Sequence, residues 1–133
     1  MMSRLTILFV VALVVLSLGA CGPAAAKQVN LSEKDAGSTV QLRAGDTLEV
    51  VLVEDYPGAG YLWEVRAGDT AVLEQVGEAQ FQSDNGPPGS SAKETLRFTA
   101  VAAGQTALKL IYQRPFEQDV PPVKTFEVTV VVK

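Results

Sequence analysis

The stretch TLRFTAV, residues 95–101, alternates polar and apolar side chains from Thr95 to Ala100. A period of two puts the two sets of side chains on opposite faces of a strand, so this stretch predicts a β-strand with one buried face. Alternating or β-branched runs recur at residues 47–53, 62–65, 107–112 and 125–132. Weaker strands are predicted at residues 27–31, 39–42 and 72–81.

Short turn signals separate these predicted strands. They are Ala44-Gly45-Asp46, Ala67-Gly68-Asp69 and Ala103-Gly104. After Cys21, no stretch keeps a helical apolar period for three turns. Seven to eight short strands in about 105 residues predict an all-β fold, an immunoglobulin-like antiparallel sandwich of two sheets.

The N-terminus carries a targeting pattern. Arg4 precedes an apolar run at residues 7–16, and Leu18-Gly19-Ala20 precedes Cys21. This pattern resembles the lipobox of bacterial lipoproteins, in which the cysteine is lipidated and becomes the first mature residue. The alternatives are an ordinary secretory signal cut near Ala20 and a retained anchor.

The lipoprotein interpretation divides the chain into three parts. Residues 1–20 would be a lipoprotein signal peptide, residues 21–27 a lipidated tether and residues 28–133 the folded domain. We therefore expect a protein held at a membrane by Cys21, in the bacterial cell envelope and outside the cytoplasm.

Composition limits the possible partners. Loss of the leader removes Arg4 and leaves a formal charge of about −5, which argues against a nucleic-acid partner. Cys21 is the one cysteine of the sequence, so an intramolecular disulfide cannot form. Packing alone must then stabilise the domain.

The residues needed for common catalytic sites are absent. The sequence has no histidine, which excludes Ser-His-Asp and Cys-His arrangements and leaves no usual zinc ligand set. The acidic positions Glu54-Asp55 and Glu117/Asp119 sit at strand ends, where we expect solvated side chains. We predict no enzyme activity, no cofactor and no metal site.

The stretch YPGAGYLW, residues 56–63, joins two predicted strands. Pro57 fixes one backbone angle, whereas Gly58 and Gly60 permit conformations that other residues avoid. Such a loop is either a tight turn or a stiff tip that can enter a narrow cleft backbone-first. Trp63 is predicted to fill the core at the loop's base, and Tyr61 to pack on the same face.

Two more loops follow downstream. Residues 83–93 are polar and rich in glycine and proline, which also suits a plain surface connection. Residues 113–117 read QRPFE, and Arg114 and Phe116 are residue types that dominate binding hot spots. If residues 27–31 and 39–42 together make the first strand, the loops after the second, fourth and sixth strands gather at one end as a binding edge.

With these three loops the chain resembles the chagasin-like inhibitors of papain-type cysteine proteases. The family's first motif, N-P-T-T-G-[YF]-x-W, is matched at Pro57, Gly60, Tyr61 and Trp63. Its second, G-x-G-G, has its nearest match at Gly89-Ser90-Ser91-Ala92, and its third, R-P-W, appears as Arg114-Pro115-Phe116.

The resemblance implies reversible occlusion of a papain-like protease by three loops, residues 55–61, 83–93 and 113–118. The residues implied to contact the protease are Pro57, Gly58, Ala59, Gly60, Tyr61, Gly89, Ser90, Ser91, Arg114, Pro115 and Phe116. The departures at Tyr56, Gly58, Ala59 and Ser91-Ala92 leave an alternative open. In that alternative, the protein is a non-inhibitory immunoglobulin-like envelope lipoprotein that binds another protein or an envelope ligand.

Overall fold

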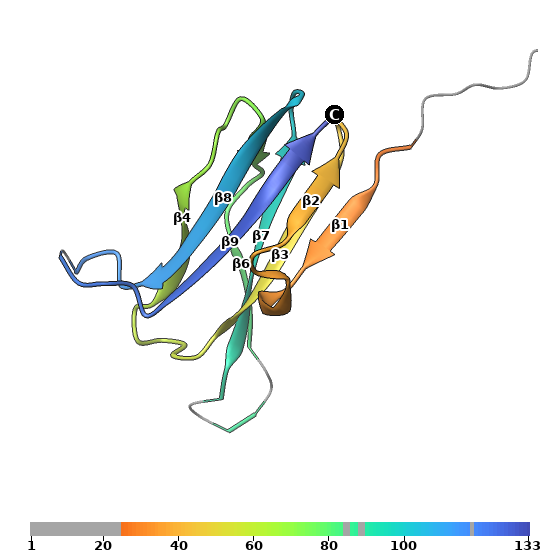
Figure 1. Cartoon of the computed structure of the whole chain (residues 1–133). Coiled ribbons are helices and arrows are strands. Elements are labelled where there is room, and N and C mark those ends of the chain that lie inside the picture. The colour runs from red at the N-terminus through yellow and green to blue at the C-terminus, as the bar shows by residue number, and fades with distance from the viewer. Residues whose placement is uncertain (1–24, 84–85, 88–89, 118) are drawn as a thin grey trace, which may run out of the picture.

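The structure, a computed structural model, describes residues 25–83, 86–87, 90–117 and 119–133. These residues form nine strands and one 3₁₀ turn (Figure 1). The elements are β1 (Gln28–Leu31), η2 (Glu33–Asp35), β2 (Thr39–Leu42), β3 (Thr47–Glu54), β4 (Leu62–Ala67), β5 (Leu73–Gln75), β6 (Gln80–Ser83), β7 (Ala92–Ala100), β8 (Gly104–Gln113) and β9 (Lys124–Val132).

The strands form two sheets that pack face to face. One sheet has the order β1-β3-β7-β5, with β6 also paired to β7, and the other has the order β2-β9-β8-β4. The all-β two-sheet sandwich predicted from the sequence is therefore confirmed.

Alternation along the long strands builds the core. In β3, β7 and β9 every second side chain is buried, as the period of two requires. The inward side chains of both sheets interlock, and several of them are completely or almost completely inaccessible to solvent. The largest of these apolar side chains are Tyr112, Phe98, Phe126, Leu42, Leu48, Leu52, Leu96, Leu108 and Leu110.

The N-terminal strands differ from the prediction. Residues 27–31 and 39–42 do not make one strand, because the chain turns at η2 and places β1 and β2 in different sheets. β1 pairs with β3 and β2 pairs with β9, and both pairings are parallel, whereas the other pairings are antiparallel. The chain leaves β1, passes through β2 in the other sheet and returns as β3. The parallel neighbours β1 and β3 are therefore joined through the other sheet, and not by a crossover within their own sheet.

The predicted strand at residues 72–81 is two strands. Gly77 has a φ of +68°, a left-handed conformation that interrupts the extended chain between β5 and β6. Both short strands still pair with β7, β5 at Phe98–Ala100 and β6 at Ala92–Thr95. This split, with the separate β1 and β2, raises the strand count to nine instead of seven to eight.

The two ends of the sandwich carry different parts of the chain. The ends of β3, β6 and β8 and the starts of β4, β7 and β9 lie toward the lower end of the sandwich in Figure 1, whereas β1 begins and β9 ends at the opposite end. The nine strands and their common core lie within residues 25–133, so we expect this portion to fold by itself. Within the described residues, no helix has the length and apolar character needed to cross a membrane.

Candidate functional site

Strand registers bring the three predicted loops to one end of the molecule. In one sheet, Ala92 at the start of β7 pairs with Glu54 at the end of β3 and with Ser83 at the end of β6. In the other, Leu62 at the start of β4 pairs with Gln113 at the end of β8. We call the first loop residues 55–61, the second loop residues 84–91 and the third loop residues 114–123, and their common surface the loop edge.

The predicted contact residues differ in how far solvent reaches them. Residues 57–60 and residues 115 and 116 are exposed, whereas Tyr61, Arg114, Ser90 and Ser91 are half-buried. Phe116 exposes 73% of its surface and Tyr56 exposes 52%, so both offer apolar area at the loop edge. Gly89 and the predicted lipidation residue Cys21 lie outside the described residues.

An aromatic column runs from the first loop into the core. Its members are Tyr56, Tyr61, Tyr112 and Trp63, and successive ring centroids are 5.4, 5.4 and 5.2 Å apart. Tyr112 and Trp63 are buried, while Tyr56 is exposed. Stacked and tilted rings at this spacing attract each other, so the column supports the loop from below.

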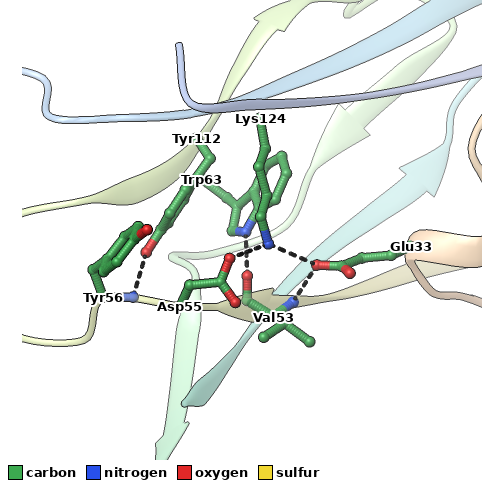
Figure 2. A network of polar contacts seen from close by, with 7 residues as sticks. All are labelled: Glu33, Val53, Asp55, Tyr56, Trp63, Tyr112 and Lys124. Atoms are coloured by element: carbon green, nitrogen blue, oxygen red, sulfur yellow. Dashed lines mark hydrogen bonds and ion pairs between the residues drawn. The ribbon is translucent and has the colours of Figure 1, made fainter. Parts of the chain in front are cut away.

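Side chains of the column hold both ends of the first loop. The backbone N–H of Tyr56 donates to the hydroxyl of Tyr112 at 3.1 Å (Figure 2). Trp63 donates through Nε1 to the carbonyl of Val53 at 3.0 Å, which joins the strand after the loop to the strand before it. The loop therefore leaves β3 and enters β4 at fixed points.

An ion network lies beside this anchor. The ammonium group of Lys124 pairs with Asp55 and, at 3.8 Å, with Glu33, whose carboxylate accepts the N–H of Val53 (Figure 2). Burial disfavours the charged form of Lys124, but Asp55 and Glu33 outweigh this effect and raise its pKa. The first residue of the loop, Asp55, is thus tied to β9.

Arg114 joins the third loop to the first. Its Nε donates to the carbonyl of Ala59 at 2.9 Å, and its guanidinium lies over the ring of Tyr61, 4.6 Å from the centroid. Its Nη1 donates to Glu117 at 2.8 Å, and this hydrogen bond raises the pKa of Arg114. The sequence predicted an outward binding residue; the structure has a side chain engaged with two loops.

Gly60 and Phe116 make the second contact between these loops. Gly60 has a φ of +87°, and a β-carbon at this position would lie 3.1 Å from Cε1 of Phe116. Gly58 also has a positive φ, +80°, but a β-carbon there would meet nothing within 4 Å. Glycine at position 60 therefore serves both the backbone turn and the close approach of the third loop.

The described part of the second loop is locally bonded. Both the backbone N–H and the hydroxyl of Ser90 donate to the carbonyl of Pro87, at 3.0 and 2.6 Å. Ala92, where β7 begins, is buried.

The third loop extends further than the predicted residues 113–118. It continues to Val123, whose backbone N–H donates to the carbonyl of Tyr112 at 2.9 Å. Val120 and Pro122 line a groove together with Ile111, an outward-facing residue of β8 that is nevertheless buried. The loop therefore packs on the outward face of its sheet.

The sequence suggested that the acidic residues at strand ends are solvated, but three of the four are buried or ion-paired. Glu54 is buried, because it occupies the inward face at the end of β3. Asp55 and Glu117 are ion-paired with Lys124 and Arg114, and only Asp119 of the four is exposed without a bond that supports the site. In the described part of the chain, no three His, Cys, Asp or Glu side chains gather closely enough to hold a metal ion.

Sequence reasoning missed several residues that support the loops. Tyr112, Glu94 and Lys124 lie on strands, and their alternation marks them only as inward or outward positions. The one available signal was a carboxylate at the inward position of Glu94, between the apolar positions Ala92 and Leu96. Hydrogen bonds to loop backbone depend on tertiary geometry, which this pattern does not contain.

Comparison with known proteins gives a consistent assignment. The family model described as "Chagasin family peptidase inhibitor I42" matches residues 41–130, more than half of the chain. Amoebiasin-2 of Entamoeba histolytica is 26% identical over 104 residues, which are 77% of this chain and 84% of the relative.

Solved structures share the fold. The cysteine protease inhibitor EhICP2 of Entamoeba histolytica superposes with a TM-score of 0.72 at 23% identity, covering 84% of this chain and all of that one. PbICP-C, solved in complex with falcipain-2, gives a TM-score of 0.52 at 16% identity and covers 84% of this chain and 95% of that one. At these identities the structural likeness supports the fold.

Proposed function

Because the chain belongs to the chagasin family of peptidase inhibitors, we propose that it reversibly inhibits papain-type cysteine proteases with its loop edge. The first loop would enter the active-site cleft, with the second and third loops on either side of it. Membership of an inhibitor family also means that the protein is not an enzyme.

The observation that carries this proposal is the bond between Arg114 and the carbonyl of Ala59. The tip of the first loop has little side-chain bulk, so its backbone would have to make the contacts in a narrow cleft. A backbone that is already braced loses less conformational entropy on binding than a free loop does. It can also fill a substrate groove without bringing a peptide bond into the geometry of attack.

Two exposed rings supply the apolar contacts of the proposed interface. Tyr56 and Phe116 flank the small-residue tip, and large aromatic side chains at the centre of an interface contribute most of its binding energy. A protease–inhibitor interface of ordinary size buries about 1,600 Å². We expect the interface to be shared among the three loops.

Departures from the family motifs affect the expected strength of inhibition. The resemblance implies a threonine near the catalytic histidine of the protease where this chain has Ala59. Loss of one side-chain hydrogen bond typically costs about 0.5–1.5 kcal/mol. Phe116 in place of tryptophan keeps the ring and loses the indole N–H. We expect weaker inhibition than from a chain with the full motifs.

Titration of residues 25–133 against papain and a cathepsin tests the proposal. We expect reversible inhibition that is competitive with a peptide substrate. A folded protein that leaves several such proteases fully active at micromolar concentration would instead favour the alternative, an envelope lipoprotein whose loop edge binds another ligand. The altered motif positions Tyr56, Gly58 and Ala59 are what favours that alternative.

We also propose that Cys21 is lipidated and tethers the domain to a membrane in the bacterial cell envelope. The pattern Leu18-Gly19-Ala20-Cys21 supports this proposal. In addition, β1 begins at the end of the sandwich opposite the loop edge, so a tether there would leave the loops facing away from the membrane. Each buried methylene of an acyl chain contributes about 0.8 kcal/mol, so two or three chains anchor stably.

Expression of the whole chain in a bacterial host tests the anchor. We expect the mature protein to partition with membranes, and its N-terminal peptide to carry the mass of acyl chains on Cys21. Cys21→Ser should release the protein from the membrane or stop its processing. An unaltered chain whose N-terminal peptide carries no acyl mass, or a Cys21→Ser variant that is processed and held at the membrane like the unaltered chain, would contradict lipidation.

A further inference from the structure

Two carboxyl groups are buried between the sheets directly below the first loop. Glu94 of β7 is 1% exposed and Glu54 of β3 is 5% exposed. Glu94 pairs in register with Leu52 and Glu54 with Ala92, so the two acids are diagonal neighbours on the inward face of adjacent strands. Two neighbouring acids in the core need an explanation, because burial disfavours the charged form of a carboxyl group.

Within the part of the chain that the structure describes, no cation forms an ion pair with either of these acids. Glu64 of β4 adds negative charge on the side of the second sheet, and Tyr112 of β8 contributes a neutral phenol. The ammonium group of Lys124, 5.9 Å from the centroid of the Tyr112 ring, is engaged by Asp55 and Glu33. Among the four ion pairs found in the described residues, none involves Glu54 or Glu94.

Glu94 bonds to the strand that leaves the first loop. Its Oε2 accepts the backbone N–H of Trp63 at 2.8 Å, inside the core. Trp63 in turn donates through Nε1 to Val53, next to Glu54. The carboxyl pair is therefore linked to both ends of the first loop. Glu94 accepts a hydrogen bond from Trp63 just after the loop, and Glu54 is the residue just before it.

Burial determines the protonation of this pair. It raises the pKa of Glu94 to about 7, with Glu54 and Glu64 acting in the same direction and the N–H of Trp63 opposing them. Burial also raises the pKa of Glu54. Glu94 is therefore protonated in most molecules at mildly acidic pH and ionised in most molecules at alkaline pH, where its charge adds to the acidic surroundings.

We propose that Glu94 is a positioning residue for the first loop, and that the loop keeps its binding shape while the Glu54–Glu94 pair carries a proton. With both groups ionised, mutual repulsion pushes the ends of β3 and β7 apart, and the need for hydration opens the core between the sheets, which loosens the fixed points at Trp63 and Val53. Inhibition is then strongest at mildly acidic pH and weakens above neutrality. This inference rests on the proposed function.

The direction of this pH dependence follows from the linkage between folding and protonation. A carboxyl group whose pKa is raised by the fold stabilises the folded shape fully below its unfolded value. That contribution is lost as pH rises through the folded value, about 7 for Glu94. One linked proton changes an equilibrium by at most about tenfold per pH unit.

The inhibition constant of residues 25–133 against papain, measured from pH 5 to pH 8, tests the proposal. Glu94→Gln is the matched variant, because its amide oxygen still accepts the N–H of Trp63 and carries no charge at any pH. The ratio of the two inhibition constants cancels the titration of the protease. We expect the unaltered protein to weaken about three- to tenfold relative to Glu94→Gln between pH 6 and pH 8. A ratio that stays constant over this range would overturn the proposal.

A second readout does not depend on inhibition. In the free protein, we expect the backbone amide signals of Trp63, Gly58 and Gly60 to titrate together with a midpoint near neutral pH. Glu54→Gln should lower that midpoint by removing one of the like charges. If these signals do not titrate, Glu94 does not position the loop, even where inhibition is found. If they titrate and no protease is inhibited, the positioning role stands and the proposed target is wrong. If Glu94→Gln fails to fold, the titration of the unaltered protein still decides.

Discussion

Arg114 donates its Nε hydrogen to the backbone carbonyl of Ala59 at 2.9 Å, which joins the third loop to the tip of the first. The bond places a charged donor on a carbonyl that would otherwise face solvent, in a loop made mostly of glycine, alanine and proline. The shape of this loop is therefore set by residues outside it: Arg114 above, and Tyr112 and Trp63 below.

Arg114→Ala should free the tip of the first loop. The variant loses the bond to Ala59, the pairing with Glu117 and the stacking on Tyr61. We expect inhibition of papain to weaken about ten- to hundredfold, because hydrogen bonds of charged groups contribute about 1.5–3 kcal/mol. Arg97→Ala, which breaks an ion pair with Glu49 away from the loop edge, is the control and should inhibit normally. Equal inhibition by both variants would show that the brace is unnecessary.

Gly60→Ala should damage both stability and inhibition. The substitution places a β-carbon at a φ of +87° and 3.1 Å from the ring of Phe116. Gly37→Ala is matched for backbone strain, with a φ of +84° and nothing within 4 Å. We expect each to lower the free energy of unfolding by about 1 kcal/mol, and only Gly60→Ala to weaken inhibition. Normal inhibition by a folded Gly60→Ala protein would argue against the close approach of the two loops.

Tyr112→Phe removes the hydroxyl that accepts the N–H of Tyr56. The ring stays in the core, so packing is retained, while the N–H at the start of the loop loses its partner. We expect the free energy of unfolding to fall by about 1 kcal/mol in a urea titration. Amide exchange at Tyr56 should also accelerate. Unchanged exchange at Tyr56 would mean that another group holds the start of the loop.

Phe116→Ala should separate binding from stability. The ring is 73% exposed, so its removal should change the free energy of unfolding by no more than about 0.5 kcal/mol. Inhibition should weaken by about 2 kcal/mol if this ring is an interface hot spot. Val101→Ala removes an exposed side chain near the opposite end and should leave inhibition unchanged. A loss of stability from Phe116→Ala without a loss of inhibition would assign the ring a purely structural role.

Asp46→Asn should weaken the end of the sandwich opposite the loop edge. The carboxylate of Asp46 accepts the backbone N–H groups of Arg43 and Lys27, and these bonds lower its pKa. A carboxyl group with a lowered pKa stabilises the fold above its unfolded value, and this contribution is lost as pH falls. The unaltered protein should therefore lose more stability than Asp46→Asn between pH 5 and pH 2, while both inhibit alike at neutral pH. Parallel stability profiles would contradict this role of Asp46.

Much of the fold could be predicted from the pattern of side chains. The alternation at residues 95–101 and in the other long runs located β3, β4, β7, β8 and β9. The separate pairing of β1 and β2 could not be predicted, because each is only four residues long. Which sheet each joins depends on the chain crossing between the sheets at η2. The break between β5 and β6 depends on the left-handed conformation of Gly77, which the composition of that stretch permits but does not require.

The sequence predicted the loops of the candidate site, but it did not predict the strand residues that hold those loops in place. Pro57, Gly60 and Arg114 stand out in the sequence because they match positions of the first and third loop motifs of the family. The bond of Arg114 to Ala59, and that of Glu94 to Trp63, depend on distances between segments that are far apart in the sequence. A linear pattern reports the face of a strand and carries no information on such partners.

Protection from hydrogen exchange in a complex with papain tests the central claim most directly. We predict that papain slows amide exchange in residues 56–60 and 114–117 and leaves the turn at residues 43–46 unaffected, because that turn lies at the opposite end of the sandwich. Protection should vanish when the papain cleft is first filled by a covalent peptide inhibitor. Protection that survives the filled cleft, or that maps to the end opposite the loop edge, would contradict the account.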